Sequence, residues 1–385
     1  MADPTMKPLS DNQRLDWLRL IRSENVGPVV FRQLLERYGN PAAALEALPD
    51  LARRAGAKRR IRICPPEEAD AEAKAARKAG ARLVALCEPG YPALLRSLDD
   101  APPVLTVLGE GEAFAPPCVG IVGARNASAN GRRLAERIAA DLVAAGFAVA
   151  SGMARGIDTA AHRGALPGAT IAVLAGGCDI IYPPENEALH AEIRAKGAVI
   201  SEMPLGTVPQ ARHFPRRNRL ISGLSLGVVV VEAAKRSGSL ITARFAGEQG
   251  REVFAVPGSP LDPRAGGCNQ LIREGAVLIE SAADVIEALA PLHPHGKTLP
   301  PAPRSLAQPG PAAVPPAPEP GNAERAIIEE LLGADPIAVD EVVRLSTLPI
   351  AVVHGVLLEL ELAGKVERHP GNRFARLYKA PADPL

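Results

Sequence analysis

The chain has 385 residues, with 44 Lys and Arg residues against 43 Asp and Glu residues, so its formal net charge is only +1. This balance excludes a globally basic coat for nucleic acid and an acidic disordered tail, and it requires any basic site to be a local patch. The length allows two or three domains. Because aromatic residues make up only 3%, we expect Ala, Val, Leu and Ile to form the core.

The cysteines and the N-terminus point to an intracellular setting. The five cysteines are scattered without a CxxC pair, which argues against a disulfide framework or a structural zinc site and is typical of a reducing cytosol. The first residues contain no apolar signal core, and no run reaches the ~18 apolar residues that a membrane span needs. We therefore expect a cytoplasmic protein without a membrane segment.

Residues 1–80 are expected to form a helical domain of their own. Apolar residues recur at helical spacing between 14 and 55, and the pattern is broken at Val26-Gly27-Pro28 and at Gly39-Asn40-Pro41. Helices joined by glycine turns are typical of small nucleic-acid-binding modules. A helical cap that only packs against the rest of the chain explains the pattern equally well.

Strands and helices alternate through the next region, residues 81–290. Short β-branched runs, each bounded by Gly or Pro at its C-terminal end, predict strands at 118–123, 147–152, 170–176, 198–203, 226–233, 252–258 and 276–281. Amphipathic stretches separate them, such as 131–145, which Gly146 closes. The alternation predicts an α/β fold with a doubly wound, mostly parallel sheet covered by helices on both faces.

The last part of the chain contains a linker and a further domain. Residues 291–322 include eleven prolines and are interpreted as a semi-extended linker, or alternatively as a peptide for a proline-binding partner. Residues 323–385 predict three helices followed by a hairpin with its turn at Pro370-Gly371-Asn372. Three helices and a β-wing describe a winged helix.

Ligands of an open α/β sheet bind beyond the carboxyl ends of its strands, so the loops there are the candidate sites. In the loop Gly123-Ala124-Arg125, glycine allows a phosphate to approach the backbone and Arg125 offers a charged fork, although Arg125 could equally pair locally. The loop matches neither GxGxxG nor a P-loop, and no acid ends the second strand. Bound NAD is therefore not expected, and no cofactor is predicted.

A second candidate loop begins with Ser151 and Gly152. Its glycines permit a tight turn towards a helix at 159–166, for which Asp158 or Thr159 is a good N-cap. We interpret Asp158 as a cap rather than a catalytic acid. His162 has no second metal ligand at a suitable spacing, so we expect it to pack inside the fold.

The strongest signal for binding lies between Thr207 and Arg219. A run of charged residues can also be a solvated surface face. Such a face normally has acids among its basic residues, and this stretch contains no acid. Arginine forks suit phosphate oxygens, and an aromatic ring can stack on an unpaired base. The candidate residues are Arg212, His213, Phe214, Arg216, Arg217, Asn218 and Arg219.

Two further loops complete the candidate set. Ser237, Gly238 and Ser239 precede a predicted helix and could form a backbone anion nest, while Glu232 is expected to pair with an arginine. The loop from Gly176 to Asn186, which includes Tyr182, could hold a base or a sugar. No Ser-His-Asp set, paired carboxylates or activated thiol emerges, so we expect no enzymatic activity.

These residues resemble the DprA/Smf DNA-processing family over about 14–378. The carriers of the resemblance are VGAR (122–125), SGMARGIDTAAHRGAL (151–166), HFPRRNRLISGLS (213–225) and VVVEAAKRSGSLITA (229–243). It implies an extended Rossmann-like core, an N-terminal SAM-like helical domain and a winged helix. The G-S/T-R motif of the family falls on Gly123, Ala124 and Arg125, where Ala124 lacks the usual hydroxyl. In the winged helix, Thr347-Leu348-Pro349 replaces the usual glycine-serine start of the third helix.

The resemblance implies a recombination mediator that binds single-stranded DNA, protects incoming strands during natural transformation and helps to load a RecA-type recombinase. It also implies a homodimer, for which 250–280 is a reasonable interface. One alternative is a nucleotide-processing hydrolase of the lysine-decarboxylase-like Rossmann type, although its PGGxGTxxE loop is replaced here by SGSLITA. Another is a winged-helix repressor with a ligand-sensing core.

Overall fold

The computed structural model describes residues 8–57, 59–109, 111–290 and 320–377. Within these ranges, residues 72–290 form one compact unit, and residues 9–71 form a second unit together with residues 320–377. The proline-rich segment predicted as a linker lies almost entirely outside the described residues.

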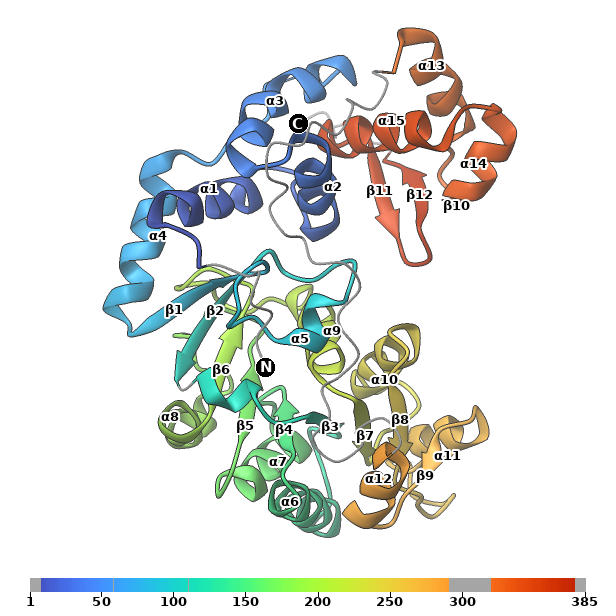
Figure 1. Ribbon diagram of the computed structural model, residues 1–385. Helices are drawn as coiled ribbons and strands as arrows, with labels where there is room; N and C mark the ends of the chain where they lie inside the picture. Colours follow the sequence, from blue (N-terminus) through green and yellow to red (C-terminus); the bar gives the residue numbers. More distant parts are fainter. Residues whose placement is uncertain (1–7, 58, 110, 291–319, 378–385) are drawn as a thin grey trace, which may run out of the picture. The chain divides into compact units, whose positions relative to one another are not determined.

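A mixed nine-stranded sheet organises the first unit (Figure 1). Its order is β1-β2-β6-β5-β4-β3-β7-β8-β9, and the pairs from β6 to β9 are all parallel, whereas β1 and β2 join the β6 edge in antiparallel pairs. The strands are β1 (Ala81–Ala85), β2 (Val104–Gly109), β3 (Cys118–Gly123), β4 (Ala148–Ser151), β5 (Thr170–Val173), β6 (Ala198–Ser201), β7 (Gly227–Val231), β8 (Glu252–Ala255) and β9 (Val277–Leu278). The seven strands predicted from β-branched runs are confirmed, and the two antiparallel edge strands are additions.

The direction of the winding reverses between β3 and β7. From β3 the chain builds β4, β5 and β6 outward on one side, and then it returns to place β7 against the other side of β3. A doubly wound sheet opens a crevice at such a reversal, beyond the carboxyl ends of the strands. The loop after β3, which begins at Ala124, therefore lies at the expected ligand position.

Helices cover both faces of the sheet, as predicted. Val119 and Ile121 of β3 are fully buried in a core shared with helices α6 and α7, whereas Gly120 between them faces Ile221 of α9. Adjacent strand residues point to opposite faces, so α9 lies across the sheet from α6 and α7. The helices within this unit are α5 (Ala93–Arg96), α6 (Ala129–Ala144), α7 (Ile157–Ala165), α8 (Glu187–Lys196), α9 (His213–Leu224), α10 (Ser239–Glu248), α11 (Gly266–Arg273) and α12 (Ala282–Leu289), with short 3-10 turns at Gly111–Phe114 and Pro184–Asn186. Helix α4 (Pro66–Lys78) crosses the boundary between the two units.

The second unit contains the helices predicted at both ends of the chain. α1 (Asp11–Arg22), α2 (Pro28–Tyr38) and α3 (Pro41–Arg54) are separated at the two predicted glycine turns, and Pro28 and Pro41 each occupy a first helical position, where a missing N–H costs nothing. The C-terminal module has helices α13 (Asn322–Leu331), α14 (Val339–Ser346) and α15 (Ile350–Leu362). Its sheet has the order β10-β12-β11, from Ile337–Ala338, Arg373–Arg376 and Val366–His369. The predicted winged helix is confirmed, with β10 as an addition.

Within the described ranges, no single helix has the length and apolar character needed to cross a bilayer. α14 and α15 meet such a criterion only when taken together, and they are bent by 118° at the break between them.

Candidate nucleic-acid interface

Two guanidinium groups converge on the ring of Phe214 at the first turn of α9. The Cζ of Arg125, from the loop after β3, lies 5.2 Å from the ring centroid, and the Cζ of Arg217 lies 5.9 Å from it. Tyr182 approaches the same ring with a centroid distance of 5.9 Å and an interplanar angle of 58°. We call these four residues the Phe214 cluster. The Arg125 loop and the 212–219 stretch, two separate candidates in the sequence, therefore meet at one site.

The four side chains differ in their access to solvent. Arg125 is exposed, Tyr182 is 50% exposed and Phe214 is half-buried, whereas Arg217 is only 5% exposed. The cluster therefore presents an open edge of aromatic and cationic groups above a buried cation. Guanidinium groups that lie against aromatic rings are attracted by the ring quadrupole, and this attraction helps to hold Arg125 near the ring.

Arg217 is a buried cation whose charge is only partly compensated. Burial lowers the pKa of its guanidinium, the nearby Arg125 acts in the same sense, and the carboxylate of Asp158 opposes both. Its Nε atom is buried without a hydrogen-bond partner among the described residues. A buried donor without an acceptor is costly, and the positive charge of Arg217 favours an anion at the open edge of the cluster.

Glycine 152 is needed for Arg217 to occupy this position. A Cβ atom built on Gly152 would lie 1.3 Å from Nη1 of Arg217. The contribution of Gly152 is therefore space for a cation, and its amide is already used, because its N–H donates to the Asp158 carboxylate over 3.1 Å. Ser151 is fully buried and donates its hydroxyl hydrogen to the carbonyl of Ile121. Ser151 and Gly152 therefore support the site from within the fold, and their direct contact with DNA stays a prediction.

Asp158 does not cap a helix as predicted. α7 begins at Ile157 with Gly156 as its N-cap, and Asp158 accepts hydrogen bonds from the preceding loop, from the N–H groups of Gly152 and Ala154. Burial raises the pKa of Asp158, while the charge of Arg217 and the two amide bonds act in the opposite sense. His162 is fully buried and pairs its Nδ1 with the Thr170 hydroxyl at 2.7 Å, so its predicted packing role is confirmed.

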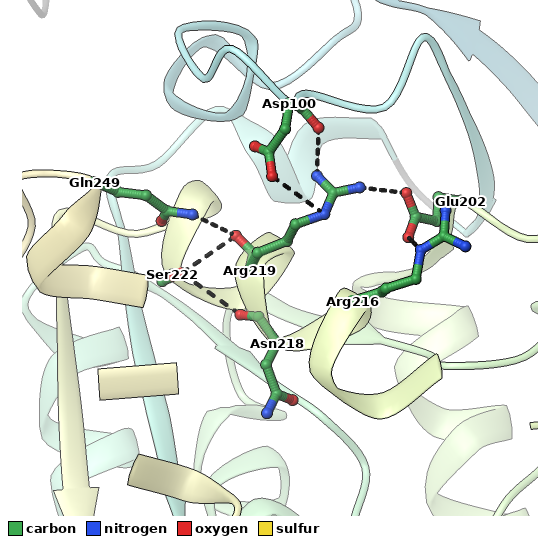
Figure 2. A network of polar contacts seen from close by, with 7 residues as sticks. All are labelled: Asp100, Glu202, Arg216, Asn218, Arg219, Ser222 and Gln249. Atoms are coloured by element: carbon green, nitrogen blue, oxygen red, sulfur yellow. Dashed lines mark hydrogen bonds and ion pairs between the residues drawn. The ribbon is translucent and has the colours of Figure 1, made fainter. Parts of the chain in front are cut away.

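Arg219 is committed to the protein itself (Figure 2). Its guanidinium binds the Glu202 carboxylate and the backbone carbonyl of Asp100, and its Nε lies 3.6 Å from the Asp100 carboxylate. The side chains of Arg219 and Glu202 are 7% and 9% exposed. The charge of Arg219 is therefore engaged by acids that lie outside the arginine-rich stretch, and a phosphate contact by Arg219 stays a prediction that its pairing disfavours.

The other residues of the stretch have distinct surroundings. Arg212 is exposed, and Arg216 is exposed with its Nε 3.8 Å from the Glu202 carboxylate. His213 is buried at the start of α9, where burial, helped by Arg212 and Arg216, lowers its pKa. Asn218 donates to the carbonyl of Gly238 over 3.3 Å, and so it ties α9 to the loop before α10.

Several backbone amides of that loop and of the first turn of α10 have partners within the protein. The N–H of Ser239 donates to the Ser237 hydroxyl, and the N–H groups of Leu240 and Ile241 donate to the carbonyls of Ser237 and Gly238. The hydroxyls of Ser237 and Ser239 also bind each other, at 2.7 Å. These three amides are therefore engaged within the protein, and a contact between DNA and residues 237–239 stays a prediction.

The N-terminus of α6 is likewise occupied from within. The Glu232 carboxylate accepts hydrogen bonds from the N–H and the hydroxyl of Ser128, the N-cap of α6, and a Cβ on Gly131 would lie 2.5 Å from it. Helix N-termini attract anions, and here the anion is a side chain of the protein. Glu232 was expected to pair with an arginine, and this capping role replaces that expectation.

The sheet reversal, the Phe214 cluster and the winged helix together define an α/β protein of the Rossmann type with a local cationic and aromatic site. Residues 82–290 match the family described as DNA recombination-mediator protein A, residues 11–75 match the DprA-like N-terminal HHH domain, and residues 311–372 match the DprA winged helix domain. The chain therefore belongs to the DprA/Smf DNA-processing family. The resemblance stated from the sequence is confirmed.

Individual relatives agree with this assignment. The chain is 39% identical to Protein Smf of Synechocystis over 75% of its length and 78% of the relative, and 44% identical to the DNA processing protein DprA of Bacillus subtilis over 55% and 73%. The solved structure of DprA from Streptococcus pneumoniae is similar with a TM-score of 0.61 at 36% identity, covering 73% of this chain and 98% of that one. DprA from Helicobacter pylori, solved for its unique single-stranded DNA binding mode, gives a TM-score of 0.51 at 29% identity over 55% and 96%.

Proposed function

We propose that this protein binds single-stranded DNA at the Phe214 cluster and acts as a non-enzymatic recombination mediator. The observation that carries the proposal is the convergence of Arg125 and Arg217 on one aromatic ring. Guanidinium groups bind phosphate oxygens, and an accessible ring stacks on an unpaired base, whatever the base is. The single-stranded DNA binding mode of the Helicobacter pylori relative supports the same substrate.

Each residue of the proposed site has a separate role. Arg125 is exposed and would bind a phosphate, while Arg217 would supply a fixed positive charge from below. Phe214, extended by Tyr182, would stack on a base. Gly123 leads into the turn that carries Arg125, and a Cβ there would lie 1.9 Å from the carbonyl oxygen of Val231. Gly156 lets the carbonyls of Ala124 and Arg125 approach, because a Cβ at that position would lie 2.3 Å and 2.6 Å from their oxygens. Arg212 and Arg216, both exposed, would extend the path of the backbone.

The wider function follows from the family. We propose that the protein protects incoming single strands during natural transformation, helps to load a RecA-type recombinase and works as a homodimer in the cytoplasm. We also propose a division into domains at residues 1–80, 81–290, 291–322 and 323–385. Contacts at a ring and at phosphates do not read base edges, so sequence specificity is expected to be low.

The test is a titration of the whole protein with single-stranded and double-stranded oligonucleotides of equal length at two salt concentrations. The proposal predicts tighter binding of the single strand at both, because a base inside a duplex cannot reach Phe214. Equal or tighter binding of the duplex would contradict it. Release of free base from nucleoside monophosphates would instead support the hydrolase alternative.

A further inference from the structure

The third helix of the winged-helix module, α15, lacks the character of a helix that reads DNA. Its sequence, IAVVHGVLLELEL, contains no Lys or Arg. Its two acids are engaged within the module, because Glu359 is fully buried against Arg325 and Glu361 pairs with Arg368. A helix in the major groove needs cations for phosphates and polar side chains for base edges. A helix that is apolar on nearly all sides is instead expected to be buried.

Most of α15 beyond its first turn is buried because it packs in two directions. On one side, Val353, Val356 and Leu357 lie in the core of the winged helix with α13, α14 and Phe374. The same core includes Ala55, which follows α3 of the N-terminal helices and is only 2% exposed. A residue from the opposite end of the sequence therefore completes the core of this module.

Polar and close contacts extend this interface along α15. Nδ2 of Asn25, in the turn between α1 and α2, donates to the carbonyl of Leu362 over 2.9 Å. A Cβ on Gly355 would lie 3.8 Å from the Arg37 guanidinium of α2, so α15 approaches this helix closely. Asn25 satisfies one of the last carbonyls of α15, which has no partner within its own helix.

In the turn between α1 and α2, the carboxylate of Glu24 and two backbone amides have partners within the protein. The Glu24 carboxylate accepts from the N–H of Arg62 and pairs with Arg59, and these contacts hold the pKa of Glu24 below its usual value. The N–H groups of Glu24 and Val26 donate to the carbonyls of Arg62 and Ser23. The turn thus contains a carboxylate paired with Arg59 and two amides that are engaged within the protein, where a DNA-binding hairpin would offer amides that are free.

From these contacts we infer that α15 is the docking surface for the N-terminal helices of this same chain, and that the two modules act as one body rather than as two separate duplex readers. The turn lies against the C-terminal end of α15, where Asn25 binds the carbonyl of Leu362. This inference does not depend on the single-strand site, which lies on the other unit.

The docking can be tested in the full chain with Ala55→Arg, which places a charge in the shared core, and with Ala42→Arg on the exposed side of α3 as the matched control. Hydrogen–deuterium exchange should become at least about tenfold faster in 350–362 and in 28–38 for the first variant only. Unchanged exchange in 350–362, or faster exchange confined to the residues around Ala55, would overturn the inference.

A milder variant covers the case in which Ala55→Arg does not fold. Asn25 has a φ of +59°, so Asn25→Gly removes the bond to Leu362 without backbone strain. We expect exchange near the end of α15 to become about fivefold faster, as for the loss of one hydrogen bond. No change there would count against docking.

The second arm asks whether α15 reads a duplex. Ile350→Glu adds a negative charge at the exposed start of α15. If α15 is a docking surface, the Ile350→Glu variant should bind a short duplex with an affinity within about threefold of that of the unmodified protein. If α15 reads the major groove, the added negative charge should weaken duplex binding by more than this. A larger loss would overturn the inference.

Discussion

The guanidinium of Arg217 occupies space that exists only because residue 152 is glycine, since a Cβ at that position would lie 1.3 Å from Nη1 of Arg217. Asp158, in the first turn of α7, accepts a hydrogen bond from the amide of Gly152 and raises the pKa of the same cation. One backbone position therefore sets the location of the buried charge under Phe214.

Gly152→Ala should displace Arg217. We expect a loss of about 1–3 kcal/mol in stability from overpacking, together with weaker binding of single-stranded DNA. Urea unfolding and a fluorescence titration with oligo-dT measure the two effects. Gly247→Ala is the control, because a Cβ there meets nothing within 4 Å and the position is helical. Unchanged DNA affinity in Gly152→Ala would show that Arg217 does not contribute to the site.

Phe214→Ala should remove base stacking. The expected loss is about 5- to 150-fold in affinity for a single strand, corresponding to about 1–3 kcal/mol for one stacked base. The salt dependence should stay the same, because no charge is removed. Phe245→Ala serves as the matched control, since Phe245 lies on α10 and also contacts an arginine. Equal losses in the two variants would contradict a specific role for Phe214.

Arg219→Ala should affect folding rather than binding. Removing one partner of a buried ion pair leaves the charge of the other partner poorly compensated. We expect a loss of about 3 kcal/mol in the free energy of unfolding. The loss should lie at the lower end of the range for buried pairs, because Arg216 remains near Glu202. The salt dependence of DNA affinity should match that of the unmodified protein. Glu202→Gln removes the same ion pair from the other side. A reduced salt slope in Arg219→Ala alone would restore Arg219 to the DNA site.

Stability should fall in mild acid because of His162. Burial lowers its pKa from 6.5 to about 3. Between these two pKa values, His162 binds a proton in the unfolded chain but not in the folded chain. The free energy of unfolding is therefore highest above pH 6.5 and decreases as the pH falls below it. At pH 5 the loss from this group is about 2 kcal/mol. Urea unfolding measures this effect. Between pH 7 and pH 5, the free energy of unfolding of His162→Asn should fall by correspondingly less than that of the unmodified protein. Between pH 7 and pH 8, the change in the free energy of unfolding should be the same for both proteins.

The parallel strands could be predicted because strands buried on both faces are continuous β-branched runs. The run at 118–123, for example, coincides with β3. The antiparallel strands β1 and β2 at the sheet edge carry no such repeating strand–helix signal, and they were missed. The charge of Arg219 was misjudged for a related reason, because its partners Asp100 and Glu202 lie 119 and 17 residues away in the sequence. A local stretch without acids does not exclude acids that the fold brings to it.

The position of Arg125 and Phe214 at one site could be inferred, since strand-end loops of a doubly wound sheet meet at one rim. The sequence could not show which backbone amides of these loops remain free. Those of Gly152 and Ser239 bind oxygens of Asp158 and Ser237, and Glu232 fills the N-terminus of α6. Such internal partners depend on side-chain packing, which composition and spacing do not specify.

The most direct measurement is the salt dependence of oligo-dT affinity for Arg125→Ala, compared with Arg137→Ala on the exposed face of α6, where Arg137 pairs with Asp141. If Arg125 binds a phosphate, its loss should weaken binding and reduce the slope of log affinity against log salt by about 0.7, as for one contact to a single strand. The Arg137 variant should keep both values. An Arg125 variant with unchanged affinity and slope would contradict the site proposed here.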